Sequence, residues 1–375
     1  MPPETSGLDE LVAEAQRLST ICNACRYCEG HCAVFPAVER RQRVTLNDAD
    51  FLSQLCHQCG ACFANCQYAP PHEFAVNMPV ALAELRTSGY RRFARPALLA
   101  VGFELRWVTV LMLVAFATLL FAVLAGWRAG FDVLLTEPAS GFYEVLPHGL
   151  LIQVFGLAAV AVLLSWAWSI GSYWRQMGLP MPWRISASVW LQALVNAFTL
   201  KNLDGGHGEG CYETGEMPNR WRRRWHHLVL TGFVLCFAAT LSGTVNHYVL
   251  DLPAPYDWLS LPKLLGMPGG LLLLAGCTGL LIHRRNIEPA ILTSEQQMAQ
   301  SLLLLLLLTS LTGLALPLLK SSAWQPLLLC LHLGVVLVLF FNFAAGKFVH
   351  GFYRLIALVQ DQLEIVASDS LSSNP

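Results

Sequence analysis

The chain of 375 residues is 55% hydrophobic and only 13% charged. A soluble protein carries about a quarter charged residues, so this composition excludes a wholly soluble protein and indicates a bilayer around part of the chain. The formal net charge of −1 excludes a basic nucleic-acid-binding protein. Residues 1–10 contain no apolar run, so we expect no secretory signal.

The first 96 residues contain no segment apolar enough to cross a membrane. Asn47 and Asp48 are candidate caps of a helix that begins before Phe51, and residues 78–85 predict one more helix. We therefore predict a small helical domain over residues 1–96. Its first segment has apolar residues at helical spacing: Leu8, Leu11, Val12, Ala15 and Leu18.

Two identical cysteine runs dominate this domain. Each has the spacing Cys-x-x-Cys-x-x-Cys-x-x-x-Cys, over residues 22–32 and 56–66. Bacterial two-cluster ferredoxins have this spacing, and the fourth cysteine of each run ligates the other cluster. Three closely spaced thiolates can wrap three corners of a cubane from one loop, whereas the fourth corner must be filled from another direction. We therefore predict two [4Fe–4S] clusters, the first held by Cys22, Cys25, Cys28 and Cys66, and the second by Cys56, Cys59, Cys62 and Cys32.

Structural zinc is the alternative, because Cys₄ zinc sites also use C-x-x-C pairs. Zinc does not require two identical runs, so the pattern favours iron–sulfur clusters. Proline usually follows the fourth cysteine of a ferredoxin run, whereas Ala33 and Gln67 stand there, which affects the local turn rather than the ligation. Residues 205–211 indicate a glycine-rich loop more than a metal site at His207. We expect the four scattered cysteines to be small apolar side chains or free thiols: Cys211, Cys236, Cys277 and Cys330.

Beyond residue 96 the chain becomes strongly apolar. Six segments approach or exceed the roughly 18–20 apolar residues that a spanning helix needs. They cover residues 107–127, 150–170, 228–250, 264–282, 302–319 and 326–346. A shorter stretch, residues 185–198, predicts a helix in the membrane interface. The expected architecture is all-α: a two-cluster ferredoxin-like domain, a six-span transmembrane bundle over residues 97–367, and a disordered tail over residues 368–375.

The distribution of lysine and arginine predicts the orientation. These residues concentrate before the first span, between the second and third, after the fourth and after the sixth, whereas the other loops hold only Arg128, Lys263 and Lys320. By the positive-inside rule, both termini and the cysteine-rich domain are cytoplasmic. Six spans are consistent with two termini on one side.

Histidines at the span ends are the second candidate site, because imidazole in a bilayer is costly and indicates function by default. His332 and His350 are 18 residues apart, about five turns, so they share a helix face. On the third span, His247 lies near the outer end, and the adjacent His226 and His227 lie at the cytoplasmic start. If the third and sixth spans run antiparallel, His247 pairs with His332, and His226 or His227 pairs with His350. This predicts one or two bis-histidine b-type haems, with face geometry slightly favouring His226 as the inner ligand.

Other histidines have simpler explanations. His148 and His283 also lie at span ends, where we expect interface anchoring, and they remain reserve candidates for iron. His31 and His57 lie among the cluster cysteines and are expected to shield or tune the clusters rather than bind iron. His72 has no assigned role.

Four segments carry a resemblance to a known family: CNACRYCEGHCAVFPA, CHQCGACFANCQYAPP, RRRWHHLVLTGFVLCFAAT and LHLGVVLVLFFNFAAGKFVHGFYR. Nearly the whole chain resembles the tricarballylate-utilisation protein B family, also called citrate-utilisation protein B. The resemblance implies a multi-pass protein of the bacterial inner membrane, with two [4Fe–4S] clusters and b haem, that reoxidises a soluble FAD-dependent tricarballylate dehydrogenase. The membrane part is also similar to the haem-bearing gamma subunits of respiratory nitrate reductases, where paired histidines on two spans hold two haems.

The sequence therefore predicts an electron conduit. A soluble FAD-dependent dehydrogenase docks on the cytoplasmic domain, and electrons pass through the clusters and haem to membrane quinone. The sequence contains no evident nucleophile–base pair, phosphate loop or nucleotide fingerprint, so we expect no catalysis on a carbon substrate by this chain alone. Two alternatives remain: a conduit for a different flavoprotein dehydrogenase, and a haem-free membrane transporter or redox sensor with an iron–sulfur domain.

Overall fold

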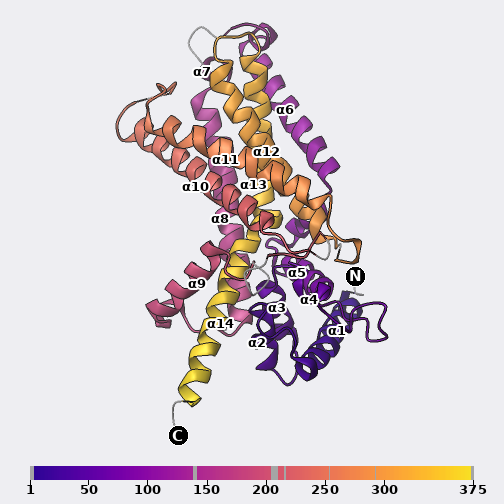
Figure 1. Cartoon of the computed structure of the whole chain (residues 1–375). Helices are drawn as coiled ribbons and strands as arrows, with labels where there is room; N and C mark the ends of the chain where they lie inside the picture. Colours follow the sequence, from indigo (N-terminus) through magenta and orange to yellow (C-terminus); the bar gives the residue numbers. More distant parts are fainter. Residues whose placement is uncertain are drawn as a thin grey trace.

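The computed structural model describes residues 4–137, 142–203, 210–214, 217–252, 254–291 and 293–372. Over these ranges the chain is helical without strands, and one antiparallel bridge joins Cys211 to Asn219. The all-α class predicted from the sequence is confirmed. Most of the glycine-rich loop, residues 204–209 with His207, falls outside the described ranges. Figure 1 shows long membrane helices above a group of shorter helices, with both termini on the side of the shorter helices.

Five helices form the cysteine-rich domain: α1 (Glu4–Cys25), α2 (Val34–Glu39), α3 (Leu46–Leu55), α4 (Ala61–Ala64) and α5 (Met78–Phe93). The cap of α3 is Thr45 rather than Asn47 or Asp48, because the Thr45 hydroxyl accepts from the Asp48 backbone N–H. Asp48 completes a capping box by accepting from the Thr45 backbone. Asn77 caps α5 by accepting from the Val80 N–H.

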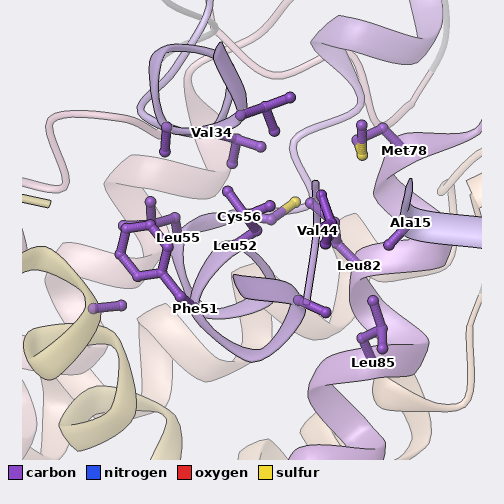
Figure 2. Packing of buried hydrophobic residues seen from close by; sticks show 14 of the residues in the cluster. Ala15, Val34, Val44, Phe51, Leu52, Leu55, Cys56, Met78, Leu82 and Leu85 are labelled. Atoms are coloured by element: carbon purple, nitrogen blue, oxygen red, sulfur yellow. The ribbon is translucent and has the colours of Figure 1, made fainter. Parts of the chain in front are cut away.

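The core of this domain draws on both ends of the chain. Leu18 of α1, Phe51 of α3 and Leu85 of α5 are fully buried in one cluster, part of which Figure 2 shows. Ala357 and Leu358 belong to the same cluster, and they come from the C-terminal helix α14 (His350–Ser372). The helix α14 therefore packs onto the core of the cysteine-rich domain, although it follows the last span in the chain.

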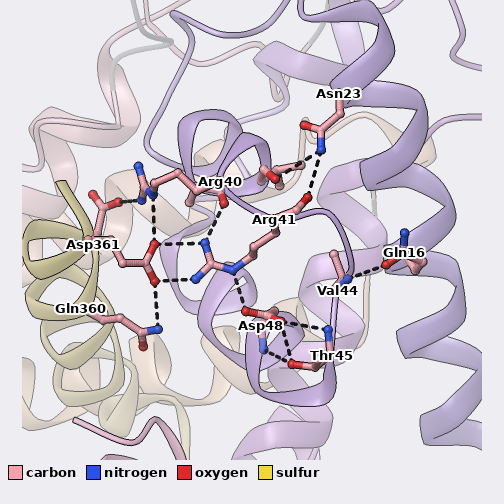
Figure 3. A network of polar contacts seen from close by, with 12 residues as sticks. Gln16, Asn23, Arg40, Arg41, Val44, Thr45, Asp48, Gln360 and Asp361 are labelled. Carbon is pink, nitrogen blue, oxygen red and sulfur yellow. Dashed lines mark hydrogen bonds and ion pairs between the residues drawn. The ribbon is translucent and has the colours of Figure 1, made fainter. Parts of the chain in front are cut away.

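A polar network fastens α14 to the N-terminal helices, as Figure 3 shows. Arg40 donates to Asp361 at 2.6 Å, and Arg41 donates to Glu364 at 2.5 Å. Arg41 also donates to Asp48 at 2.6 Å, so one guanidinium joins α14 to the start of α3. Because the Arg41 side chain is only 9% exposed, these bonds are shielded from water more than a surface ion pair is.

Among the residues that the structure describes, six helices are long and apolar enough to span a membrane: α6 (Trp107–Ala129), α8 (His148–Gln176), α10 (Trp221–Tyr248), α11 (Leu261–Arg284), α12 (Glu295–Leu318) and α13 (Gln325–Ala345). They agree with the six spans predicted from the sequence, and the chain is a multi-pass membrane protein. Short helices lie between them: η1 (Ala97–Glu104), η2 (Phe131–Leu134), α7 (Phe142–Val145), η3 (Pro182–Arg184), α9 (Ala187–Thr199), η4 (Pro289–Ile291) and η5 (Lys347–Val349).

Each span packs against particular other spans. The helix α10 packs along α11, where a side chain on Gly232 would lie 2.7 Å from the Gly269 carbonyl oxygen, so glycine is needed for this close approach. The helix α13 packs against α6, α12 and α8. The third and sixth spans are therefore not packed directly along their lengths.

Two further helices lie beside the cysteine-rich domain. The helix α9 buries Val189 and Ala193, packs on α14, and leaves Leu191 and Phe198 exposed, which agrees with an amphipathic helix over residues 185–198. The helix α14 continues to Ser372. Residues 368–372 are therefore helical where a disordered tail was predicted, and residues 373–375 lie outside the described ranges.

Candidate redox centres

The first cysteine cavity opens at the surface of the cysteine-rich domain. It has a volume of about 280 Å³, and Tyr27 at its edge is 67% exposed. Burial and the neighbouring thiols raise the pKa of both Cys22 and Cys28 to about 12, so these thiolates require a cationic partner at neutral pH. The four cysteines expected for the first cluster line this cavity: Cys22, Cys25, Cys28 and Cys66. Cys62 lines it as well.

The second cysteine cavity lies deeper in the domain. Its volume is only about 20 Å³, so the cavity would have to expand before it could hold a cluster. Burial raises the pKa of Cys32 and Cys62 far above the usual thiol value, with a further contribution from nearby Cys56 and Cys59. The lining includes the four cysteines expected for the second cluster: Cys32, Cys56, Cys59 and Cys62.

The grouping of the cysteines has the geometry that cross-ligation requires. Cys66, the last of the second run, lines the first cavity, and Cys32, the last of the first run, lines the second. The four thiols expected for each cluster thus line one cavity.

Glycine lets the second run approach the membrane part. Gly60 has a φ of 75°, in the left-handed region, and a side chain there would lie 3.2 Å from the backbone of Tyr212. The Tyr212 N–H donates to the Cys59 carbonyl at 2.8 Å, and Arg222 of α10 donates to the Gln58 carbonyl at 2.9 Å. The second cavity is therefore held directly against the start of the third span.

Arg354 of α14 makes the other connection. Its guanidinium donates to the Cys56 carbonyl at 2.5 Å and to Nε2 of His57. Burial and the charges of Arg354, Arg222 and Arg86 lower the pKa of His57 well below its usual value, so this ring is neutral. His57 is thus positioned by its neighbours, which agrees with a shielding role rather than iron ligation.

One predicted histidine pair is brought together. The rings of His226 and His350 have centres 6.3 Å apart. An imidazole nitrogen lies about 2 Å from a metal ion and about 1.1 Å from its ring centre, so two imidazoles on one iron have centres about 6 Å apart. Nδ1 of His350 donates to the Lys347 carbonyl at 2.6 Å, which leaves Nε2 for a ligand. His227 instead contacts the Phe198 carbonyl at 3.2 Å.

The predicted outer pair is not formed. His332 faces α12, where its Nδ1 lies 2.8 Å from the Thr312 hydroxyl, and Gly313 leaves room for its ring. His247 lies against His148 instead, with ring centres 4.2 Å apart, too close for an iron between them. In this structure the two rings have other neighbours, because α10 packs along α11 rather than α13, and the outer haem between His247 and His332 stays a prediction.

Comparison with known proteins covers both parts of the chain. Residues 102–370 match the family model described as Citrate utilization protein B, and residues 15–92 match its Fer4-like domain. The chain is 43% identical over 370 residues to Citrate utilization protein B of Escherichia coli, covering 96% of this chain and 94% of that protein.

The chain belongs to the citrate utilization protein B family.

The resemblance noted from the cysteine and histidine segments is thereby confirmed. The Fer4-like match over residues 15–92 contains all eight cysteines of the two runs. No solved structure matches this family member.

Several charged residues at the site were not anticipated as part of it. Three of them were used only to predict the orientation of the spans, because the positive-inside rule explains positive charges at span ends: Arg222, Lys347 and Arg354. Glu213 was not singled out, yet its carboxylate pairs with Arg222 and lies 3.1 Å from Nε2 of His283. This contact gives His283 a structural role at the start of the membrane part. The sequence feature that pointed most directly to this charged group was the run of arginines at residues 222–224, just before His226.

Proposed function

We propose that this family member is a membrane electron conduit. Electrons pass from a soluble FAD-dependent dehydrogenase of tricarballylate, or a similar tricarboxylate, through two [4Fe–4S] clusters and one b haem to the quinone pool. Membership of a family named for citrate utilization, with a Fer4-like domain, supports an iron–sulfur electron-transfer role in tricarboxylate use. When bound, these groups supply one-electron redox couples, and the protein supplies ligands, spacing and burial.

The observation that carries the proposal is the spatial order of the candidate sites. The first cavity has exposed Tyr27 at its edge, where a soluble protein can approach. Cys62 lines both cavities, so the two lie side by side. Arg354 contacts Cys56 and His57, and it belongs to α14, the helix that begins at His350. This order, from the surface through the domain interior to the membrane edge, supports a relay of electrons in that direction.

The histidine pair fits b haem on chemical grounds. His226 and His350 are the right distance apart for axial ligation. Iron ligation through Nε2 of each imidazole would hold both rings in one orientation.

We place the cysteine-rich domain on the cytoplasmic side of the bacterial inner membrane. The positive residues at the ends of the spans on that side support this orientation. A cytoplasmic donor then reaches the first cavity without crossing the bilayer. The exposed apolar residues of α6, α8 and α10 face the lipid, from which a quinone would approach.

Inverted membrane vesicles, with the cytoplasmic face outward, test this proposal. Added FAD-dependent dehydrogenase and tricarballylate should reduce vesicle quinone at least tenfold faster when the chain is present than when it is absent. Right-side-out vesicles should show no such reduction, because the docking surface is then enclosed. Equal quinone reduction with and without the chain would contradict the proposal, and activity in right-side-out vesicles alone would reverse the orientation.

A further inference from the structure

An unusual group of positive charges is buried where the cysteine-rich domain meets the spans. Five cationic side chains from five different elements act on one another there: Arg86 of α5, Arg222 of α10, Arg284 of α11, Lys347 of η5 and Arg354 of α14. Arg86 is only 5% exposed. Together these cations repel one another strongly.

Two carboxylates offset part of this charge. Glu295 lies 3.1 Å from Arg86 and also pairs with Lys347. Glu213 pairs with Arg222. Arg354 has a carbonyl and a neutral imidazole as partners, and its pKa falls to about 9 through burial and the charge of Arg86. The described carboxylates therefore leave a clear excess of positive charge.

Several donors in this group also lack hydrogen-bond partners. Nε and Nη2 of Arg86 and Nε of Arg284 are buried with no acceptor in the described ranges. A buried guanidinium donor without an acceptor is costly, because it has lost its bonds to water and gained none in return. Such donors indicate an anionic acceptor that approaches from outside the protein's own side chains.

The surroundings identify the class of anion. An oxidised [4Fe–4S] cluster with four thiolates is a dianion and lies on the Arg354 side, next to Cys56. A ferric b haem with both propionates ionised is a monoanion, and together these two groups would balance the excess charge. The positive charge of Lys347 acts on His350. The backbone carbonyl of Lys347 also accepts a hydrogen bond from Nδ1 of His350. The buried cations and the candidate iron ligand His350 thus meet within residues 347–350.

We propose that Arg86 and Arg284 bind the two propionate carboxylates of a haem whose iron lies between His226 and His350. This inference rests on the haem of the proposed function and adds the residues that orient it. Guanidinium groups suit this role because they remain charged and donate two parallel bonds to a carboxylate. They would also hold the porphyrin edge toward the cysteine-rich domain.

Redox titration of the haem in the full-length protein tests the proposal. In Arg284→Gln and Arg86→Gln, loss of a nearby positive charge should favour ferric haem about tenfold, which corresponds to about 59 mV for one electron. Arg285→Gln is the matched control, because Arg285 is adjacent but exposed, and Arg284→Lys should recover most of the shift. Potentials equal to that of Arg285→Gln in both variants would overturn the proposal. So would a shift confined to the clusters, because the cations would then serve the clusters alone.

Haem with esterified propionates gives a second measurement, should a variant fail to retain haem. Full-length protein from a haem-deficient host should bind the dimethyl ester at least tenfold more weakly than haem. A variant with both Arg86→Gln and Arg284→Gln should show no such preference, since the interaction partner is gone. An equal preference in the variant and the parent protein would overturn the proposal. Absence of haem from the native protein would instead refute the proposed function, and the two failures are thus distinguishable.

Discussion

Replacing Cys32 with alanine should remove the cluster held by Cys56, Cys59 and Cys62, although Cys32 belongs to the other run. The reason is spatial: Cys32 lines the second cavity, while Cys22, Cys25 and Cys28 line the first. Iron and sulfide in the anaerobically purified protein should fall from roughly eight each per chain to about four. Electron transfer from donor to quinone should fall at least a hundredfold, because the route to the membrane part is interrupted.

The reciprocal variant makes the test specific. Cys66→Ala should remove the first cluster and leave the second, so the electron paramagnetic resonance signals of the two variants should be complementary. Cys236→Ala is the matched control, because this cysteine lies on α10, away from both cavities, and should keep full iron content. If Cys32→Ala instead removes the signal shared with Cys22, Cys25 and Cys28, each run ligates its own cluster and cross-ligation is wrong.

Replacing His350 with alanine should abolish the b haem. His350 and His226 have ring centres 6.3 Å apart, and loss of either axial ligand leaves iron with one protein bond. Pyridine-haemochrome content should fall at least tenfold in His350→Ala and in His226→Ala. The adjacent His227→Ala should keep full content, because His227 faces the Phe198 carbonyl.

His332→Ala is the informative control for this prediction. His332 contacts Thr312 of α12, so its removal should weaken packing but leave haem content unchanged. Helical periodicity alone gave the opposite expectation. Loss of half of the haem in His332→Ala would restore the two-haem hypothesis, and full haem content in both His350→Ala and His226→Ala would exclude the pair proposed here.

These cases illustrate how far sequence reasoning reaches. The cysteine spacing predicted which four thiols gather at each cavity, because ligation by two interleaved runs constrains the chain at short range. Spans were equally predictable from their length and hydropathy, as all six helices demonstrate. The structure places His226 rather than His227 beside His350, whereas the helical phase had favoured His226 for the helix face that it shares with His247.

Packing partners were not predictable in the same way. The periodicity of α13 places His332 on a face but does not determine which helix covers that face. Close glycine contacts bring α10 to α11, and His247 and His332 lie beside other side chains as a result. Likewise, Arg40 and Arg41 contact Asp361 and Glu364 more than 300 residues away, and no local pattern announces such contacts.

The central claim is that one chain holds iron–sulfur clusters and b haem together. The most direct measurement is the dithionite-reduced minus oxidised absorption spectrum of the anaerobically purified full-length protein. We expect a sharp alpha band from reduced b haem, together with bleaching of the broad absorption that iron–sulfur clusters give when oxidised. A protein that contains zinc in place of iron and gives neither feature would contradict this account.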